Sequence, residues 1–170
     1  MILKTREQLN LEYHPHRVTI LWRDSDKRRR EPIRDADGLK QSLEEAGYLH
    51  VDIVHSSNST LWSCIDCQLD IFRNTWLFIA SHGAGIMNLQ FMAANTSVVE
   101  IASADRPEEP IYSNLEQRAR LLGQHFYHYY WHDEKEKTEL NATAFVEELV
   151  EFSPPIAQPR SYHQVPQKVF

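Results

Sequence analysis

The sequence predicts an α/β fold in which a mostly parallel sheet is covered by helices on both faces. Short apolar runs alternate along the chain with segments whose apolar residues repeat at helical spacing, the pattern of folds built from β-α-β units. The central run, 76–80, is apolar throughout, which is typical of a strand buried on both faces. The length of 170 residues suits one domain.

Five segments are predicted to be strands. Each is a short run rich in β-branched or aromatic residues and is bounded by polar or turn-forming residues. In chain order they are 18–22, 51–54, 76–80, 97–101 and 125–131. The last alternates histidines with aromatic residues, which indicates a half-buried strand face rather than a set of ligands.

Helices are predicted between and after the strands. Asp35 is expected to cap the first helix and Gly47 to end it, and Gly123 is expected to close the fourth. The second is expected to be a single helix whose apolar face comprises Leu61, Ile65, Leu69 and Phe72. A third helix is expected over 86–93 and a last one over 144–152, opened near Asn141.

These elements define the expected domain organisation. Residues 17–152 are predicted to form a single Rossmann-like domain, preceded by a lead-in at 1–16. The tail at 153–170 is rich in proline and lacks an apolar period, so we expect it to be flexible and dispensable for folding. We see no internal repeat and no second domain in the sequence.

Composition and charge narrow the class of protein. The net charge of −6 argues against non-specific nucleic-acid binding, which depends on neutralising phosphates. No apolar run approaches the ~20 residues of a membrane helix, and Met1 is followed by a polar segment rather than a signal peptide. The sequence therefore predicts either a cytosolic protein or a chain whose start is missing.

Two further sequence features bear on the cellular compartment of the protein. Cys64 and Cys67 form a C-x-x-C pair; a redox pair is one interpretation, and two small apolar residues on a helix is the favoured one. Asn58, Asn95 and Asn141 each begin an N-x-[ST] glycosylation motif, which is mild support for a luminal protein.

The strongest candidate for a functional site is the segment His82-Gly83-Ala84-Gly85. Two glycines between a buried strand and a helix allow a ligand to approach the backbone closely. The N–H groups at the start of the following helix favour a diphosphate. The alternative is a plain strand-to-helix turn, and the pattern alone favours neither interpretation.

Charged residues at other strand ends could complete a diphosphate site. Arg23 follows the first strand and is expected to contact phosphate, with Arg30 as a secondary contact. Glu100 is expected either to bind ribose or to be a polar strand-end residue. Asp24 and Asp26 form a short acidic motif, but the surrounding pattern does not suit a metal site, and no metal or cofactor is expected.

The segment 78–92 resembles the hallmark strand-turn-helix of glycosyltransferase family 61, whose members include protein N-acetylglucosaminyltransferases and plant β-1,2-xylosyltransferases. Supporting similarity extends over about 17–131 and includes the strand ending at Arg23, a helical Gln68 and the Val-Glu-Ile strand at 99–101. Unlike the usual family pattern, Asn74 and Thr75 precede the hallmark strand, and Glu31 and Pro32 interrupt the basic loop.

The resemblance implies that this chain is the C-terminal, donor-binding half of a two-domain, GT-B type glycosyltransferase. The expected reaction is inverting transfer of a sugar from a nucleoside-diphosphate sugar, expected to be UDP-linked, to a hydroxyl of a protein or glycan acceptor. A missing N-terminal domain, or a partner chain, would help bind that acceptor, and the Golgi or endoplasmic reticulum lumen is the expected compartment. The expected donor-binding residues are Arg23, His82, Gly83, Ala84, Gly85, Ile86, Met87 and Asn88.

Two hypotheses about function therefore stay open. In the first, the chain supplies the donor half of the enzyme, and no residue can be assigned as the catalytic base. In the second, it is a non-catalytic nucleotide-binding or interaction module that kept the fold. In both, we expect the isolated chain to transfer little or no sugar.

Overall fold

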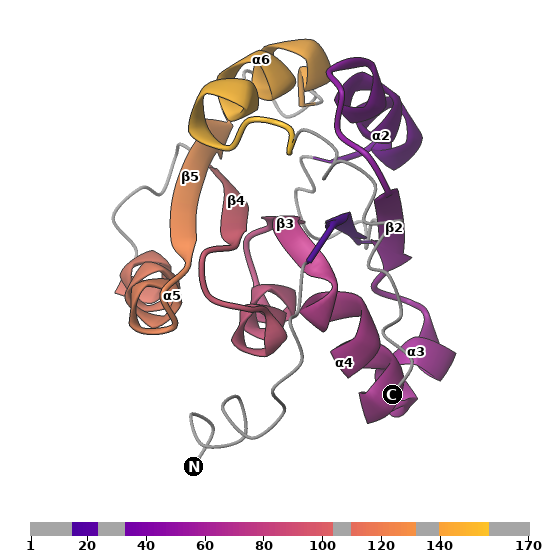
Figure 1. The fold of residues 1–170 in the computed structure, drawn as a ribbon, viewed down its shortest axis with the longest axis vertical. Helices are drawn as coiled ribbons and strands as arrows, with labels where there is room; N and C mark the ends of the chain where they lie inside the picture. Colours follow the sequence, from indigo (N-terminus) through magenta and orange to yellow (C-terminus); the bar gives the residue numbers. More distant parts are fainter. Residues whose placement is uncertain (1–14, 24–32, 104–109, 132–139, 157–170) are drawn as a thin grey trace, which may run out of the picture.

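A single five-stranded sheet forms the centre of the molecule. The computed structural model describes residues 15–23, 33–103, 110–131 and 140–156. The strands are β1 (Arg17–Trp22), β2 (Val51–His55), β3 (Thr75–Ser81), β4 (Ser97–Ser103) and β5 (His125–Trp131). Their order is β2-β1-β3-β4-β5, and every neighbouring pair is parallel (Figure 1). The predicted parallel sheet is confirmed.

Helices cover both faces of the sheet, as predicted. One face packs against α2 (Ala36–Glu45) and α6 (Ala142–Phe152), which lie together at the top of Figure 1. The opposite face packs against α3 (Ser59–Ser63), α4 (Ile65–Arg73), the 3₁₀ helix η1 (Ala84–Phe91) and α5 (Pro110–Leu121). None of the helices in the described ranges has the length and apolar character needed to cross a bilayer.

The central position of β3 explains its uninterrupted apolar sequence. All seven residues of β3 are buried, because β1 and β4 flank its edges and helices cover both faces. Alternate residues of β3 contribute to different cores: Leu77 and Ile79 face α2 and α6, whereas Phe78 and Ala80 face η1 and α4.

Several helices begin or end at the residues that the sequence predicts. Asp35 accepts a hydrogen bond from the backbone N–H of Gly38 at 2.8 Å, and Asn141 accepts one from Ala144 at 3.1 Å. Gly47 and Gly123 have φ angles of 93° and 71°, the left-handed conformation that glycine tolerates best after a helix. The predicted caps and stops are confirmed at these four positions.

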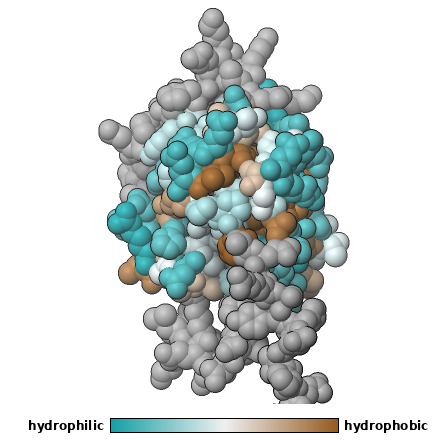
Figure 2. Space-filling view, turned by 45° about the horizontal axis from the view of Figure 1, so that its top comes forward, coloured by the Kyte–Doolittle hydropathy of each residue, from teal (hydrophilic) through white to brown (hydrophobic). Residues whose placement is uncertain are grey.

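A buried polar cluster connects Ser153, the residue after α6, to Tyr48 and Ser97 on the face that α2 and α6 cover. The Tyr48 hydroxyl donates to the Ser153 carbonyl at 2.8 Å, and the hydroxyls of Ser153 and Ser97 lie 3.0 Å apart. Buried contacts therefore reach the first residue of the predicted tail, whereas 157–170 lie outside the described residues. Figure 2, in which α2 and α6 come forward, shows a mostly hydrophilic surface with small apolar areas between.

The single helix predicted over 61–72 is wrong, because the chain breaks at Cys64. Cys64 has an extended backbone, with φ −110° and ψ 99°, and it ends α3 and caps α4 at once. Ile65, predicted to be on an apolar face, is 57% exposed as a result. Asn58 caps α3 by accepting from the N–H of Leu61 at 3.0 Å.

The break coincides with a disulfide bond between Cys64 and Cys67. Cys67 is exposed and its N–H donates to the Cys64 sulfur at 3.2 Å. The favoured interpretation of two small apolar residues on a helix is therefore wrong, and the redox-pair interpretation stays a prediction. Gln68 ties the two short helices together by donating to the Trp62 carbonyl at 3.1 Å.

Candidate functional site

The candidate site lies where the chain reverses its path across the sheet. After β1 the chain passes through α2 to β2 on one side, and β3 then returns to the other side of β1. Arg23 directly follows β1 and His82 directly follows β3, so both lie at the carboxyl ends of these neighbouring strands. This is the switch point at which ligands bind in open α/β sheets.

Arg23 packs against Gly83 in the turn of the hallmark segment (residues 82–85, the hallmark turn). The φ of Gly83, 144°, is one that residues with a side chain rarely adopt. A Cβ built on Gly83 would overlap Nη2 of Arg23 and lie 3.0 Å from Nη1, so the guanidinium packs directly on the glycine backbone. The structure thus places together two elements that the sequence separates by 60 positions, a cationic side chain and the turn predicted to hold phosphate.

The helix after the turn differs from the prediction. It is the 3₁₀ helix η1, which begins at Ala84 rather than Ile86 and ends at Phe91. Gly83 precedes it without a side-chain cap, and the Ile86 N–H donates to the Gly83 carbonyl at 3.1 Å, an i→i+3 bond. The sharp turn at Gly83 starts the helix early, so the Ile86 N–H is used inside the helix.

Gly85 has a different role from Gly83. A Cβ at Gly85 would overlap Cδ2 of Leu21, a buried residue of β1. The absence of a side chain here lets η1 pack closely on the sheet. The expectation that Gly85 leaves room for a diphosphate stays a prediction, and the structure adds a packing reason for the glycine.

The other residues of the hallmark mainly fix the turn in place. The Ile86 side chain is fully buried, and Met87 packs against the same core. Asn88 donates from Nδ2 to the Gly85 carbonyl at 2.9 Å, which braces the turn, whereas Ala84 is exposed. A diphosphate at this turn would therefore contact neither the buried side chain of Ile86 nor its N–H group, which is bonded to the Gly83 carbonyl.

Glu100 lies beneath the turn rather than at a strand end. It is fully buried in β4 and pairs in register with Ala80 on β3 and His128 on β5. Its Oε1 is 2.5 Å from Nδ1 of His82, and its Oε2 is 3.1 Å from Nδ1 of His128. The expected ribose contact stays a prediction, but this carboxylate faces two imidazoles within the protein.

The second imidazole was not identified from the sequence, which indicated only that the histidines of 125–131 lie on a half-buried strand. Nδ1 of His128 lies within ion-pair distance of Glu100 but is not aligned for a hydrogen bond with it. Nε2 of His128 also lies 3.9 Å from Glu116 on α5, which pairs with Arg120 at 2.5 Å. The titratable groups therefore form a continuous series from the hallmark turn to the surface of α5.

Part of the predicted site falls outside the described residues. Arg30, with Arg28, Arg29, Asp24 and Asp26, belongs to the segment 24–32, of which the structure gives no description. Within the described part of the chain, no group of three or more His, Cys, Asp or Glu residues could hold a metal ion.

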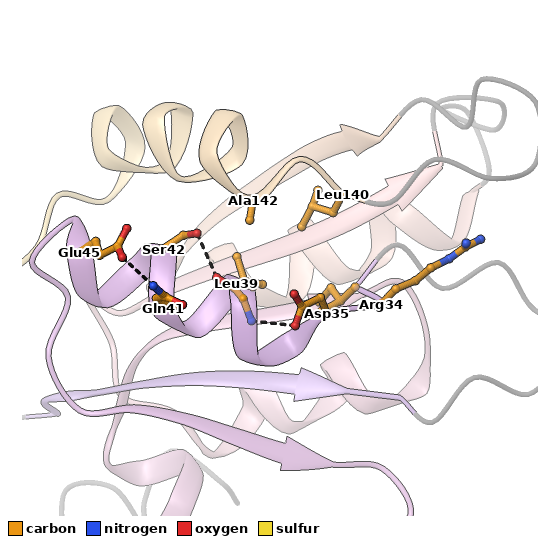
Figure 3. A pocket seen from close by; sticks show the side chains of 10 residues that line it. Arg34, Asp35, Leu39, Gln41, Ser42, Glu45, Leu140 and Ala142 are labelled. Carbon is orange, nitrogen blue, oxygen red and sulfur yellow. Dashed lines mark hydrogen bonds between the residues drawn. The ribbon is translucent and has the colours of Figure 1, made fainter.

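A cavity of about 340 Å³ lies elsewhere, between α2 and the start of α6 (Figure 3). Its polar groups are already engaged with one another: Gln41 donates to Glu45 at 2.8 Å, and Ser42 donates to the Gly38 carbonyl at 3.0 Å. Arg34 points away from the other labelled residues in Figure 3. None of the lining residues belongs to the predicted donor site.

Comparison with known proteins supports the resemblance seen at the hallmark. Residues 1–99 match the family described as Glycosyltransferase 61. The EGF domain-specific O-linked N-acetylglucosamine transferase of Canis lupus familiaris is 36% identical over 110 residues, and those of Mus musculus and Pan troglodytes are 34% identical. Each alignment covers 65% of this chain and 19% of the relative, so the chain spans about a fifth of the length of these relatives. With a family match over more than half of its residues, the chain belongs to glycosyltransferase family 61.

Proposed function

We propose that this chain binds the nucleotide-sugar donor of a glycosyltransferase at the turn that follows β3. The observation that carries the proposal is the packing of the Arg23 guanidinium on Gly83, next to His82, at the switch point of the sheet. A cationic fork beside an exposed backbone turn suits a diphosphate, because guanidinium binds phosphate oxygens in a bidentate manner.

The proposed chemistry depends on stabilising the leaving group. When the bond between the sugar and the diphosphate breaks, negative charge develops on the diphosphate oxygens. Fixed donors aimed at that charge lower the barrier, and here they are Arg23, His82 and the backbone N–H groups at the start of η1. We propose an inverting transfer to a protein or glycan hydroxyl, and we assign no catalytic base within this chain.

The relatives suggest which donor to test first. They are named for an O-linked N-acetylglucosamine transfer that is specific for EGF domains. We therefore propose a UDP-linked donor, with UDP-N-acetylglucosamine as the first candidate and an EGF domain as the first acceptor. A luminal compartment, in the Golgi or endoplasmic reticulum, is part of the same proposal and agrees with the three glycosylation motifs.

Titration calorimetry with UDP tests the donor site. Arg23→Ala should weaken binding about tenfold or more, because it removes a charge-assisted contact. Arg118→Ala is a matched control, since Arg118 is an exposed arginine on α5. The UDP affinity of this variant should equal that of the wild type. Equal UDP affinity in a folded Arg23→Ala protein would place the site elsewhere.

Transfer requires a second measurement. We propose that the donor half acts with an acceptor-binding domain in a GT-B arrangement, so these 170 residues alone should bind UDP but transfer little sugar. The assay incubates the chain with UDP-N-acetylglucosamine and an EGF domain. Robust turnover would contradict the shared-cleft proposal. Binding without turnover, even when the remaining parts of a family 61 enzyme are added, would favour the non-catalytic alternative.

A further inference from the structure

We propose that Glu100 is a positioning residue that fixes the tautomer and orientation of His82 for the diphosphate, and that His128 holds the second oxygen of the same carboxylate. The inference rests on the proposed function, since it assigns a role to residues beneath the donor turn. It differs from a ribose contact, in which the Glu100 carboxylate itself would touch the nucleoside.

The contacts place the three groups in one row. His82 continues the β3–β4 pairing, since its backbone N–H donates to the Ile101 carbonyl at 3.0 Å. Glu100 and His128 lie opposite each other on β4 and β5. Their side chains are on the face toward η1 and α5, as are those of Val98 and Phe126 two residues earlier on the same strands.

The burial of the Glu100 carboxylate favours a functional role over a purely structural one. Its side chain has no exposed surface, whereas the side chains of His82 and His128 are 26% and 17% exposed. An ionised carboxylate away from water is costly unless partners compensate for it, and apolar residues would fill the same place with less cost. A buried carboxylate in contact with two imidazoles beside a ligand site is therefore a candidate functional group.

The geometry determines which ring nitrogen can act on a ligand. An ionised carboxylate only accepts hydrogen bonds, so for an ionised Glu100 the proton lies on Nδ1 of His82, which is 2.5 Å from Oε1. A ring held in this way can meet a ligand only through Nε2. To donate to a phosphate oxygen, Nε2 must also carry a proton, and the positive ring then lies between the carboxylate and the phosphate.

Charged and titratable groups also face this unit from the neighbouring elements. The Arg23 guanidinium lies over Gly83 at the end of β1, and His128 lies on β5. Behind His128, Glu116 and Arg120 on α5 complete the series. Glu100 is the carboxylate that contacts both imidazoles, so its neutralisation should release His82 from a fixed orientation.

The first test is spectroscopic and needs no variant. Long-range ¹H–¹⁵N correlation spectra of the ¹⁵N-labelled 170-residue chain report which ring nitrogen of His82 carries the proton. We expect a protonated Nδ1 without ligand and two protonated nitrogens with UDP bound. A His82 ring protonated at Nε2 alone in the free protein would overturn the proposal.

The second test separates a positioning role from a ribose contact. Glu100→Gln should weaken UDP and inorganic pyrophosphate to the same extent, about tenfold, because both ligands present a diphosphate to His82. A ribose contact would weaken UDP and leave pyrophosphate unchanged, which would overturn the proposal. Glu151→Gln, at an exposed position of α6, is the matched control and should change neither affinity.

A pair of His82 variants provides a check that does not depend on Glu100→Gln folding. Asparagine can place its amide near the position of Nδ1, whereas glutamine can place its amide near that of Nε2. We expect His82→Asn to keep the melting temperature near the wild-type value and to bind pyrophosphate about tenfold more weakly. His82→Gln should bind more tightly than His82→Asn but melt lower. The reverse order in affinity would overturn the proposal.

The two proposals fail in distinguishable ways. If the wild-type chain binds neither UDP nor pyrophosphate, or if Arg23→Ala binds both as well as the wild type, the donor site itself is wrong. If Arg23→Ala weakens both ligands and a folded Glu100→Gln weakens neither, the donor site stands and the positioning role is wrong.

Discussion

The two faces of the sheet carry different kinds of side chain. Toward α2 and α6 the strands present mostly aliphatic and aromatic residues, with hydroxyl contacts at Ser97. Toward η1 and α4 they also present Thr19, bonded to Thr75 at 2.7 Å, and the titratable pair of Glu100 and His128. The difference suggests that one face supplies most of the stability, whereas the other holds the candidate site in position.

The strongest test of this division is Phe145→Ala on the α2/α6 face. Phe145 is fully buried and stacks edge-on against Tyr129. Truncation should cost about 3–5 kcal/mol in the free energy of unfolding, measured by urea denaturation. The UDP affinity of the folded fraction should equal that of the wild type. A folded Phe145→Ala protein with altered affinity would show that the two faces are coupled.

The two glycines of the hallmark separate packing from binding, because a Cβ at Gly85 would overlap Leu21 and one at Gly83 would overlap Arg23. Gly85→Ala should lower the free energy of unfolding by about 1–3 kcal/mol, since the new Cβ overlaps Leu21 in the core. A double-mutant cycle with Leu21→Ala should show that part of this cost depends on Leu21. Additive effects would indicate that the overlap is relieved by backbone movement.

Gly83→Ala should act mainly on binding. Its Cβ displaces the Arg23 guanidinium, and its φ of 144° is unfavourable for alanine. We expect UDP affinity to fall about tenfold, as for Arg23→Ala, and the double variant to be no weaker than either single one. Independent, multiplying losses would mean that the two residues do not act on the ligand together.

The pH dependence of the free energy of unfolding tests a residue of the α2/α6 face, Tyr48. Burial raises the pKa of Tyr48 to about 12, whereas the tyrosine of an unfolded chain titrates near 10. The unfolded state therefore loses its proton first, and stability present below pH 10 is lost as the pH rises toward about 12. The loss should be roughly 2 kcal/mol and absent in Tyr48→Phe.

Urea denaturation of the two proteins between pH 9 and about 12 measures this difference. Burial also raises the pKa of Tyr129, but that residue is present in both proteins and its contribution cancels. Parallel stability curves for Tyr48→Phe and the wild type would show that the Tyr48 hydroxyl is more accessible than its contact with Ser153 implies.

The smallest effect is expected on reducing the Cys64–Cys67 disulfide. The bond closes a very short loop, so the chain-entropy model gives about 2 kcal/mol or less. Melting with and without a phosphine reductant measures the change, and Cys64→Ser/Cys67→Ser is the matched variant. A loss as large as that of Phe145→Ala would show that the break between α3 and α4 depends on the bond.

The sequence predicted the elements whose signals are local. The five strands follow from their apolar runs, and the side chains of Asp35 and Asn141 mark helix starts that the structure confirms. The break at Cys64 was missed because the apolar spacing continues through it, while the disulfide and the cap that define it lie in the same four residues.

The candidate site was only partly predictable for a physical reason. Arg23 and the hallmark turn could be assigned because each lies at the end of a predicted strand. The contacts of Glu100 with His82 and His128 depend on the register of three strands, which is fixed by the packing of the whole sheet. In addition, β4 continues to Ser103, so Glu100 lies buried within the strand rather than at the expected strand end.

The capping asparagines have a consequence for modification of the chain. Asn58 and Asn141 begin glycosylation motifs, and both are exposed. Each uses its Oδ1 atom to accept the helix N–H, at 3.0 and 3.1 Å, whereas an N-linked sugar attaches to the amide nitrogen Nδ2. The two atoms belong to the same amide but serve different bonds, so one side chain can begin a helix and carry a glycan at the same time.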